Sequence, residues 1–230
     1  MQELRRRTIT AVIYAAVVLL AVAAPPIVLW ILLVAAAGVG LSELRQLRVG
    51  TPALVFGALF VLGLACLGLL KAAGALGAGA EIADSLPVWL LLTITPTWAA
   101  DVAAYLVGSA VGRRRIAPLI SPGKTVEGTV AGFAACALVV LAIAVLFGLP
   151  RAPAIVVAIG LGPVGLAGDL LESFVKRRAG VKDSGAVLPG HGGILDRLDS
   201  LVTGAVFVDA VVTAWVISGF GFDNGIVPRF

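Results

Sequence analysis

The chain has 230 residues, of which 60% are hydrophobic and 13% are charged, and its mean hydropathy is +1.08. Soluble domains have roughly 45–50% apolar and about 25% charged residues. The composition therefore excludes an ordinary soluble domain and indicates a chain embedded in a lipid bilayer.

Apolar windows of about 20 residues, the length that crosses a hydrocarbon core, predict an all-α, polytopic membrane protein, and several of these windows are uncharged. We expect about seven transmembrane helices in one domain, residues 1–230. The second window is the shortest, and reading it as a half-span would change the topology. The predicted helices are Thr8–Ala24, Pro26–Leu41, Pro52–Leu70, Pro87–Val111, Thr129–Leu149, Pro153–Leu171 and Leu201–Phe220.

The basic residues predict the orientation of these helices. If the N-terminus is cytoplasmic, only three of the 17 basic residues, Lys71, Arg151 and Arg229, fall outside the inner segments. This bias is what the positive-inside rule expects. The formal net charge of +4 is thus explained by topology, and we predict no nucleic-acid partner.

Two glycine patterns are attributed to helix packing and not to ligand binding. The run "GLGPVG", residues 160–165, lies within a predicted span and lacks the preceding strand that a dinucleotide fingerprint requires. Gly108 with Gly112, and Gly128 with Gly132, form G-x-x-x-G pairs. This spacing is typical of close contacts between membrane helices.

Two clusters of polar residues follow one another around residues 101–128. Asp101 lies within the fourth predicted span, where a carboxylate costs about 2.5–3.5 kcal/mol on insertion scales. It should therefore face a cavity or form a hydrogen bond to a neighbouring helix. In "SPGKTVEG", Pro122 and Gly123 interrupt any helix. The polar side chains left at the membrane surface, which a solvated loop would also explain, are Ser121, Lys124, Thr125 and Glu127.

A third cluster, residues 169–199, has the composition of a phosphate-binding site. Asp169, Ser173 and Lys176 are spaced i, i+4 and i+7, so one helix face carries an acid, a hydroxyl and an amine. Basic side chains hold phosphate oxygens, and glycine-rich loops let backbone N–H groups approach anions. The basic residues here include Lys176, Arg177, Lys182 and Arg197, and the loop contains His191, Gly192 and Gly193.

The acids of this cluster predict a divalent cation. Asp196 and Asp199 are one helical turn apart, and two like charges at this spacing repel each other unless a cation lies between them. Arg197 points to another face, so a metal ion is the better partner. Oxygen ligands suit Mg²⁺, Mn²⁺ could replace it, and a second cation is compatible. The predicted metal ligands are Asp169, Asp183, Asp196 and Asp199.

Metal-binding acids, phosphate-binding bases and a glycine loop are the parts of a site for phosphoryl or nucleotidyl transfer, chemistry that depends on positioning and electrostatics. At the inner membrane face, this predicts a nucleotide and a lipid as substrates. Residues 173–199, "SFVKRRAGVKDSGAVLPGHGGILDRLD", resemble the C-terminal signature of the phosphatidate cytidylyltransferase (CDP-diacylglycerol synthase) family. Residues 101–128 resemble a second block of that family.

The resemblance implies that CTP and phosphatidate react, with Mg²⁺, to give CDP-diacylglycerol and pyrophosphate. It implies a multi-pass protein of the bacterial inner membrane that forms a homodimer. The catalytic part would be residues 87–220, after N-terminal spans within residues 8–70. Asp169, Asp196 and Asp199 would hold the metal and the CTP phosphates, Lys176, Lys182 and Arg197 would neutralise the triphosphate, and His191–Gly193 would help to seat the nucleotide. Ser173, Arg177 and Asp183 join this nucleotide site, and Ser121, Lys124 and Thr125 would lie near the lipid phosphate.

Two alternatives stay open at this stage. A related CTP-dependent transferase acting on an ether phosphatidate or a polyprenol would keep the acids and change the lipid cavity. A membrane transporter would use Asp101 and Asp209 as an ion path. A transporter of this kind predicts paired broken helices in two repeated halves, and the sequence has no internal repeat.

Overall fold

The computed structural model describes residues 16–47, 50–75, 87–185, 187 and 192–218. Within these residues, six helices are long and apolar enough to cross a membrane. The chain is therefore a multi-pass, almost entirely helical membrane protein. Its elements are α2 (Pro26–Leu47), α3 (Thr51–Ala75), α4 (Val88–Val111), β1 (Arg115–Ala117), β2 (Ser121–Thr125), α5 (Val126–Leu146), α6 (Arg151–Arg178) and α7 (Leu195–Ile217).

Six of the predicted helices are confirmed, and several are longer than expected. The prediction that the second helix ends at Leu41 is wrong, because α2 continues to Leu47. In the same way, α6 continues beyond Leu171. Both predicted ends lie within two residues of an acid, Glu43 or Glu172, but a helix satisfies its own backbone hydrogen bonds and can continue past the hydrocarbon. Most of the first predicted helix, Thr8–Ala24, lies outside the described residues, and residues 16–23 are helical.

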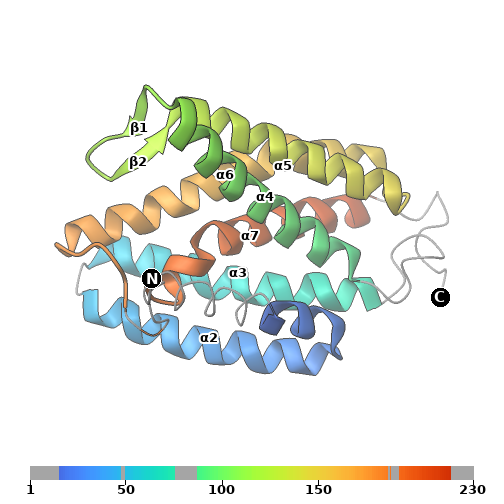
Figure 1. The fold of residues 1–230 in the computed structure, drawn as a ribbon. Helices are drawn as coiled ribbons and strands as arrows, with labels where there is room; N and C mark the ends of the chain where they lie inside the picture. Colours follow the sequence, from blue (N-terminus) through green and yellow to red (C-terminus); the bar gives the residue numbers. More distant parts are fainter. Residues whose placement is uncertain (1–15, 48–49, 76–86, 186, 188–191, 219–230) are drawn as a thin grey trace.

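A short β-hairpin interrupts the helical fold between α4 and α5. Strands β1 and β2 pair antiparallel, with Ala117 opposite Ser121. The predicted all-α fold did not include this hairpin, although the sequence analysis correctly excluded a helix at Pro122 and Gly123. Pro122 lacks a backbone N–H and Gly123 favours turns, so this polar segment adopts an extended structure at the end of the bundle (Figure 1).

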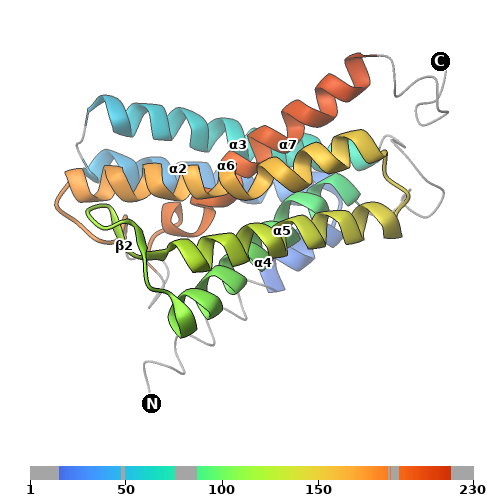
Figure 2. The same cartoon turned by 90° about the horizontal axis from the view of Figure 1, so that it is seen from above.

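Helix α7 lies at the centre of the bundle, where it contacts α2, α3, α4 and α6. Helices α4 and α5 run side by side, and α5 also packs on α6 (Figure 2). The hairpin, the C-terminal ends of α2 and α6 and the N-terminal end of α7 lie at the same end of the bundle (Figure 1). The polar segments that the charge pattern assigned to one membrane face are therefore neighbours in space.

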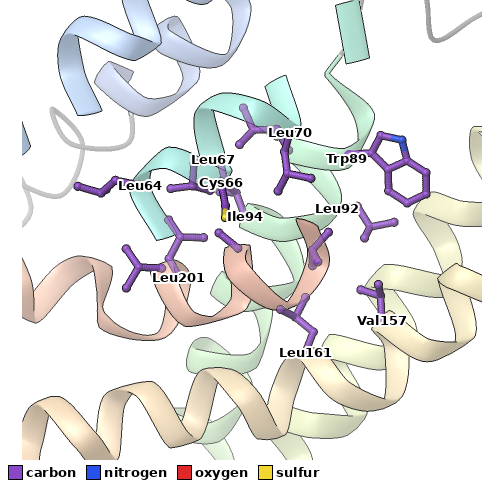
Figure 3. Packing of buried hydrophobic residues seen from close by; sticks show 14 of the residues in the cluster. Leu64, Cys66, Leu67, Leu70, Trp89, Leu92, Ile94, Val157, Leu161 and Leu201 are labelled. Carbon is purple, nitrogen blue, oxygen red and sulfur yellow. The ribbon is translucent and has the colours of Figure 1, made fainter. Parts of the chain in front are cut away.

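The apolar core fills the space where α3, α4, α6 and α7 meet (Figure 3). Leu67 and Leu70 of α3 and Leu92 of α4 are almost completely buried there, together with Val157 and Leu161 of α6. Hydrophobic side chains on the outer faces of the helices are exposed, as expected for helices that lipid surrounds. The core thus fixes the relative positions of the four helices that carry or support the polar end.

Glycines allow the closest helix contacts, as the sequence predicted. A Cβ atom on Gly128 of α5 would lie 2.5 Å from the carbonyl oxygen of Ala104 and 3.0 Å from the Cα atom of Gly108, both on α4. Within the "GLGPVG" run, Gly160 faces the ring of Phe207 on α7. The interpretation of both glycine patterns as packing surfaces is confirmed, because any larger side chain would force the helices apart.

Candidate active site

A cavity of about 380 Å³ lies between α4, β2, α5, α6 and α7. One part of its wall is apolar and includes Phe133, Leu161 and Leu166, while the other part is polar. Cavities of this size that combine an apolar wall with a few polar groups are typical of ligand sites. The titratable and hydroxyl side chains of the wall are Thr97, Asp101, Tyr105, Lys124, Thr125, Thr129, Cys136, Asp169 and Ser200.

An ion pair between Lys124 and Asp169 lies on the polar wall. Lys124 comes from β2 and Asp169 from α6, and the side chains are 25% and 23% exposed. The Ser173 hydroxyl also donates to Asp169 Oδ1 at 3.3 Å. Lys124 is held at this place by the next residue, because Thr125 caps α5 by accepting a hydrogen bond from the Gly128 N–H at 3.1 Å. The pair is therefore positioned by the hairpin and remains accessible from the cavity.

The Asp169 carboxylate of this pair also interacts electrostatically with two further carboxylates, which come from two other helices. Asp199 of α7 interacts electrostatically with Asp169 and with Asp101 of α4, and Lys124 partly compensates the repulsion. Asp199 Oδ1 also accepts a hydrogen bond from the Ser200 N–H at 2.7 Å. The prediction that Asp101 faces a cavity is confirmed. The site thus gathers three carboxylates, whose repulsion Lys124 and Arg197 partly compensate.

The carboxylates of the site could hold a magnesium ion only together with other ligands. In the described part of the chain, no three His, Cys, Asp or Glu side chains are grouped closely enough to hold a metal ion by themselves. Mg²⁺, however, usually binds through one or two carboxylates, waters and substrate phosphates. Asp169 lines the cavity, and Asp199 interacts electrostatically with it from α7, so a bound phosphate group would have to complete the coordination of a metal ion held by these two carboxylates.

Lys176 lies between two buried carboxylates on the side of α6 that faces α7. Its Nζ atom is 2.6 Å from Glu172 Oε2 and 2.5 Å from Asp196 Oδ1. The three side chains are 11%, 2% and 7% exposed, respectively. The sequence-based statement that Asp196 lacks a cationic partner is therefore wrong, because the acid and the amine are distant in sequence but adjacent where α6 and α7 pack.

The second oxygen of Asp196 fixes the segment between α6 and α7. Asp196 Oδ2 accepts hydrogen bonds from the Ser184 N–H at 2.9 Å, the Ser184 hydroxyl at 3.0 Å and the Gly193 N–H at 2.8 Å. Gly192 has a φ of +82°, and a Cβ atom there would lie 2.5 Å from the same oxygen. The Gly193 N–H, which was expected to face a bound anion, donates to this carboxylate instead.

Two other predicted residues connect structural elements. Arg177 donates from Nε to the Ile120 carbonyl oxygen at 3.1 Å and from Nη1 to the Val181 carbonyl oxygen at 2.9 Å, which ties the hairpin to the end of α6. Glu127 Oε2 accepts hydrogen bonds from the backbone N–H groups of Arg113 and Arg114 at 3.0 and 3.3 Å. Both side chains therefore hold the hairpin in place.

Three of the remaining predicted residues, Lys182, Asp183 and Ser121, do not line the cavity. Lys182 and Asp183 are exposed on the segment that follows α6, and Ser121 lies on β2 outside the cavity wall. His191 lies outside the described residues. Arg197 is exposed at the start of α7, and its charge acts on Asp101.

Sequence reasoning missed three polar residues, Glu43, Glu172 and Ser184. The Glu43 carboxylate, from α2, accepts hydrogen bonds from the Ile194 and Leu195 N–H groups. An acid four residues before Lys176 could have indicated the role of Glu172. Nothing in the sequence connects Glu43 with Ser184, since 141 positions separate them.

Comparison with known proteins identifies relatives over the second half of the chain. A family model described as the cytidylyltransferase family matches residues 77–215. Among curated proteins, a phosphatidate cytidylyltransferase of Staphylococcus saprophyticus is 44% identical over 117 residues, which are 50% of this chain and 45% of that protein. One of Synechocystis is 47% identical over 130 residues, 54% of this chain and 44% of that protein. The chain thus spans about half the length of these curated relatives.

Removal of the Lys176 amine should destabilise the fold. In Lys176→Met, Glu172 and Asp196 would face each other with no cation between them, and breaking a buried ion pair in this way costs about 3–5 kcal/mol. Lys176→Met should therefore melt well below the wild type in detergent, and adding Glu172→Gln should recover part of the loss. Lys182→Met, at an exposed lysine, is the matched control. Equal melting of Lys176→Met and Lys182→Met would contradict the assignment.

Proposed function

The chain belongs to the cytidylyltransferase family, and on that basis we propose that it transfers the cytidylyl group of CTP to phosphatidate, giving CDP-diacylglycerol and pyrophosphate. The observation that carries the proposal is that the family match over residues 77–215 includes every residue of the cavity wall. The relatives whose names specify phosphatidate support this lipid over an ether phosphatidate or a polyprenol.

The shape of the cavity supports a substrate with a charged and an apolar part. Lys124 and Thr125 lie in its polar wall, and Phe133 and Leu161 lie in its apolar wall. The lipid phosphate would contact the Lys124 ammonium, which is already accessible, and the lipid chains would extend along the apolar wall toward the bilayer. Because Lys124 is paired with Asp169, binding of a phosphate would exchange one anionic partner for another.

The reaction requires positioning more than strong base catalysis. A phosphate oxygen of phosphatidate would attack the α-phosphorus of CTP, while the bond from that phosphorus to the bridging oxygen breaks and pyrophosphate leaves. A phosphate monoester is largely ionised near neutral pH, so no residue has to remove a proton from the nucleophile. Lys124 would orient the nucleophile, and Arg197 and Lys182 would neutralise the triphosphate.

Asp169 and Asp199 would hold Mg²⁺, or Mn²⁺ in its place, which when bound neutralises charge on the phosphates. The carboxylates would keep the CTP phosphates beside the lipid phosphate, so that the two anions meet in one cavity. Asp101 would add negative charge from α4 and strengthen the preference for a cation over a neutral group.

The protein should form CDP-lipid from CTP and phosphatidate only when a divalent cation is present. We expect purified protein in detergent to convert radiolabelled CTP with added Mg²⁺ and to lose turnover in excess chelator. ATP at the same concentration is the control nucleotide. Equal turnover of ATP, or full activity in chelator, would contradict the proposed reaction.

Asp199 and Asp196 should respond differently to the loss of their charge. Asp199→Asn should lower kcat by about 10²–10³, as removal of one preorganised electrostatic group does. It should change melting little, because the change relieves repulsion among three acids. Asp196→Asn should instead lower the melting temperature, since it weakens the contacts with Lys176 and Ser184. Turnover across a Mg²⁺ titration and melting, measured in parallel, separate these effects. A fully active Asp199→Asn protein would exclude Asp199 from the site.

We also propose that the hairpin end of the bundle faces the cytoplasm of a bacterium, in its inner membrane, and that the protein is a homodimer, as the family resemblance implies. The charge bias supports this orientation, and the bacterial relatives support the inner membrane.

With the hairpin end in the cytoplasm, an impermeant thiol reagent should label Arg151→Cys in intact cells and should not label Leu119→Cys until the cells are opened. Leu119 is 90% exposed, and the native cysteines, Cys66 and Cys136, are buried. Labelling of Leu119→Cys in intact cells would reverse the orientation.

A further inference from the structure

Glu43 is a buried acid that lies outside the matched residues 77–215. It belongs to α2, one turn before the end of that helix, and it is only 2% exposed. No Lys or Arg nitrogen among the described residues forms an ion pair with it. A carboxylate in such a place is costly unless donors surround it, and the donors come from the polar segment between α6 and α7.

The Glu43 carboxylate caps α7 from a different helix. Its Oε1 accepts a hydrogen bond from the Ile194 N–H at 3.0 Å, and its Oε2 accepts one from the Leu195 N–H at 3.1 Å. The residue at the N-cap position of α7 is Ile194, whose side chain cannot accept a hydrogen bond. The first N–H groups of a helix need such acceptors, and a negative charge is favourable at this end.

The same carboxylate also holds the segment that carries Ser184. The Ser184 hydroxyl lies 3.3 Å from Glu43 Oε2 and 3.0 Å from Asp196 Oδ2, so it lies between the two acids. A Cβ atom on Gly185 would lie 2.7 Å from Glu43 Oε1, and one on Gly193 would lie 2.5 Å from Glu43 Oε2. Glycine at these two positions therefore permits the backbone to close around Glu43.

We propose that Glu43 is a positioning residue for the part of the site where Asp199 would hold the metal ion and the CTP phosphates. It holds Ser184 and the first turn of α7, and thereby sets where Asp196 and Asp199 stand relative to α6. This inference rests on the proposed function for its kinetic consequences, and on the structure alone for its effect on the segment. It assigns the N-terminal helices a part in the site and not only in anchoring the protein in the bilayer.

Glu43→Gln tests the proposal, because glutamine keeps the shape but replaces one acceptor by an amide that cannot accept the N–H groups. We expect amide hydrogen exchange in the segment 192–200 to become about 10- to 100-fold faster, since hydrogen bonds to charged acceptors are stronger than neutral ones. Segments within α5, which Glu43 does not contact, should keep their exchange rates. Ser42→Ala is the matched control, because Ser42 is exposed and bonds only to Val39 in its own helix.

Steady-state kinetics test whether Glu43→Gln affects the use of CTP, of phosphatidate or of both. In Glu43→Gln, kcat/KM for CTP should fall by about tenfold or more, while the KM for phosphatidate stays within about twofold of the wild type. Ser184→Ala should produce the same pattern, and the double variant should be less impaired than the product of the two single effects, because both act through one segment. Ser42→Ala should match the wild type in both arms.

Unchanged exchange in 192–200 in Glu43→Gln would overturn the proposal. So would faster exchange throughout the bundle with equal losses for CTP and phosphatidate, because that pattern indicates a general role in folding. If the wild-type protein forms no CDP-lipid, the proposed function fails, and the exchange arm still decides whether Glu43 positions the segment.

Discussion

Lys176 is the charge on which the polar end of the bundle depends. It neutralises Glu172 on its own helix and Asp196 on α7, and all three side chains are buried. An uncompensated charge in such surroundings is strongly unfavourable, and without this amine an acid of α6 and an acid of α7 would face each other. Asp196 in turn accepts three hydrogen bonds through its other oxygen, which ties the α6–α7 segment to the same point. One cation thereby fixes two helices and the segment that joins them.

Glycine makes these charge contacts geometrically possible. Gly192 has a positive φ beside Asp196, and Gly185 and Gly193 leave space for the Glu43 carboxylate. A glycine-rich loop is usually interpreted as a cradle for an anionic ligand. Here, several of its glycines surround anionic side chains of the protein itself. The physical principle is the same, since backbone N–H groups approach negative charge closely where no Cβ intervenes, but the first anions that they meet are carboxylates.

The sequence predicted features that depend on local or periodic properties. Apolar windows located the helices, G-x-x-x-G spacing identified the contact of α4 with α5, and the cost of burying a carboxylate placed Asp101 at a cavity. Contacts between residues far apart in the chain could not be predicted from the sequence. Lys176, the partner of Asp196, lies 20 positions away from it, and Ser184, a partner of Glu43, lies 141 positions away. The hairpin was missed because its strands are too short for an alternating pattern, although Pro122 and Gly123 correctly excluded a helix.

The ion pairs of Lys176 and the ion pair of Lys124 differ in solvent accessibility, and this difference favours a structural role for the first and a binding role for the second. Lys176, Glu172 and Asp196 are sealed, so exchanging a partner there would expose a buried charge. Lys124 and Asp169 are each about one-quarter exposed at the cavity, and a partly solvated pair contributes little stability. Under the proposed function, a phosphate group would replace Asp169 as the partner of Lys124 at small cost, which would leave Asp169 available to a cation. The sealed system preserves the geometry, and the accessible pair is the one that substrate binding can rearrange.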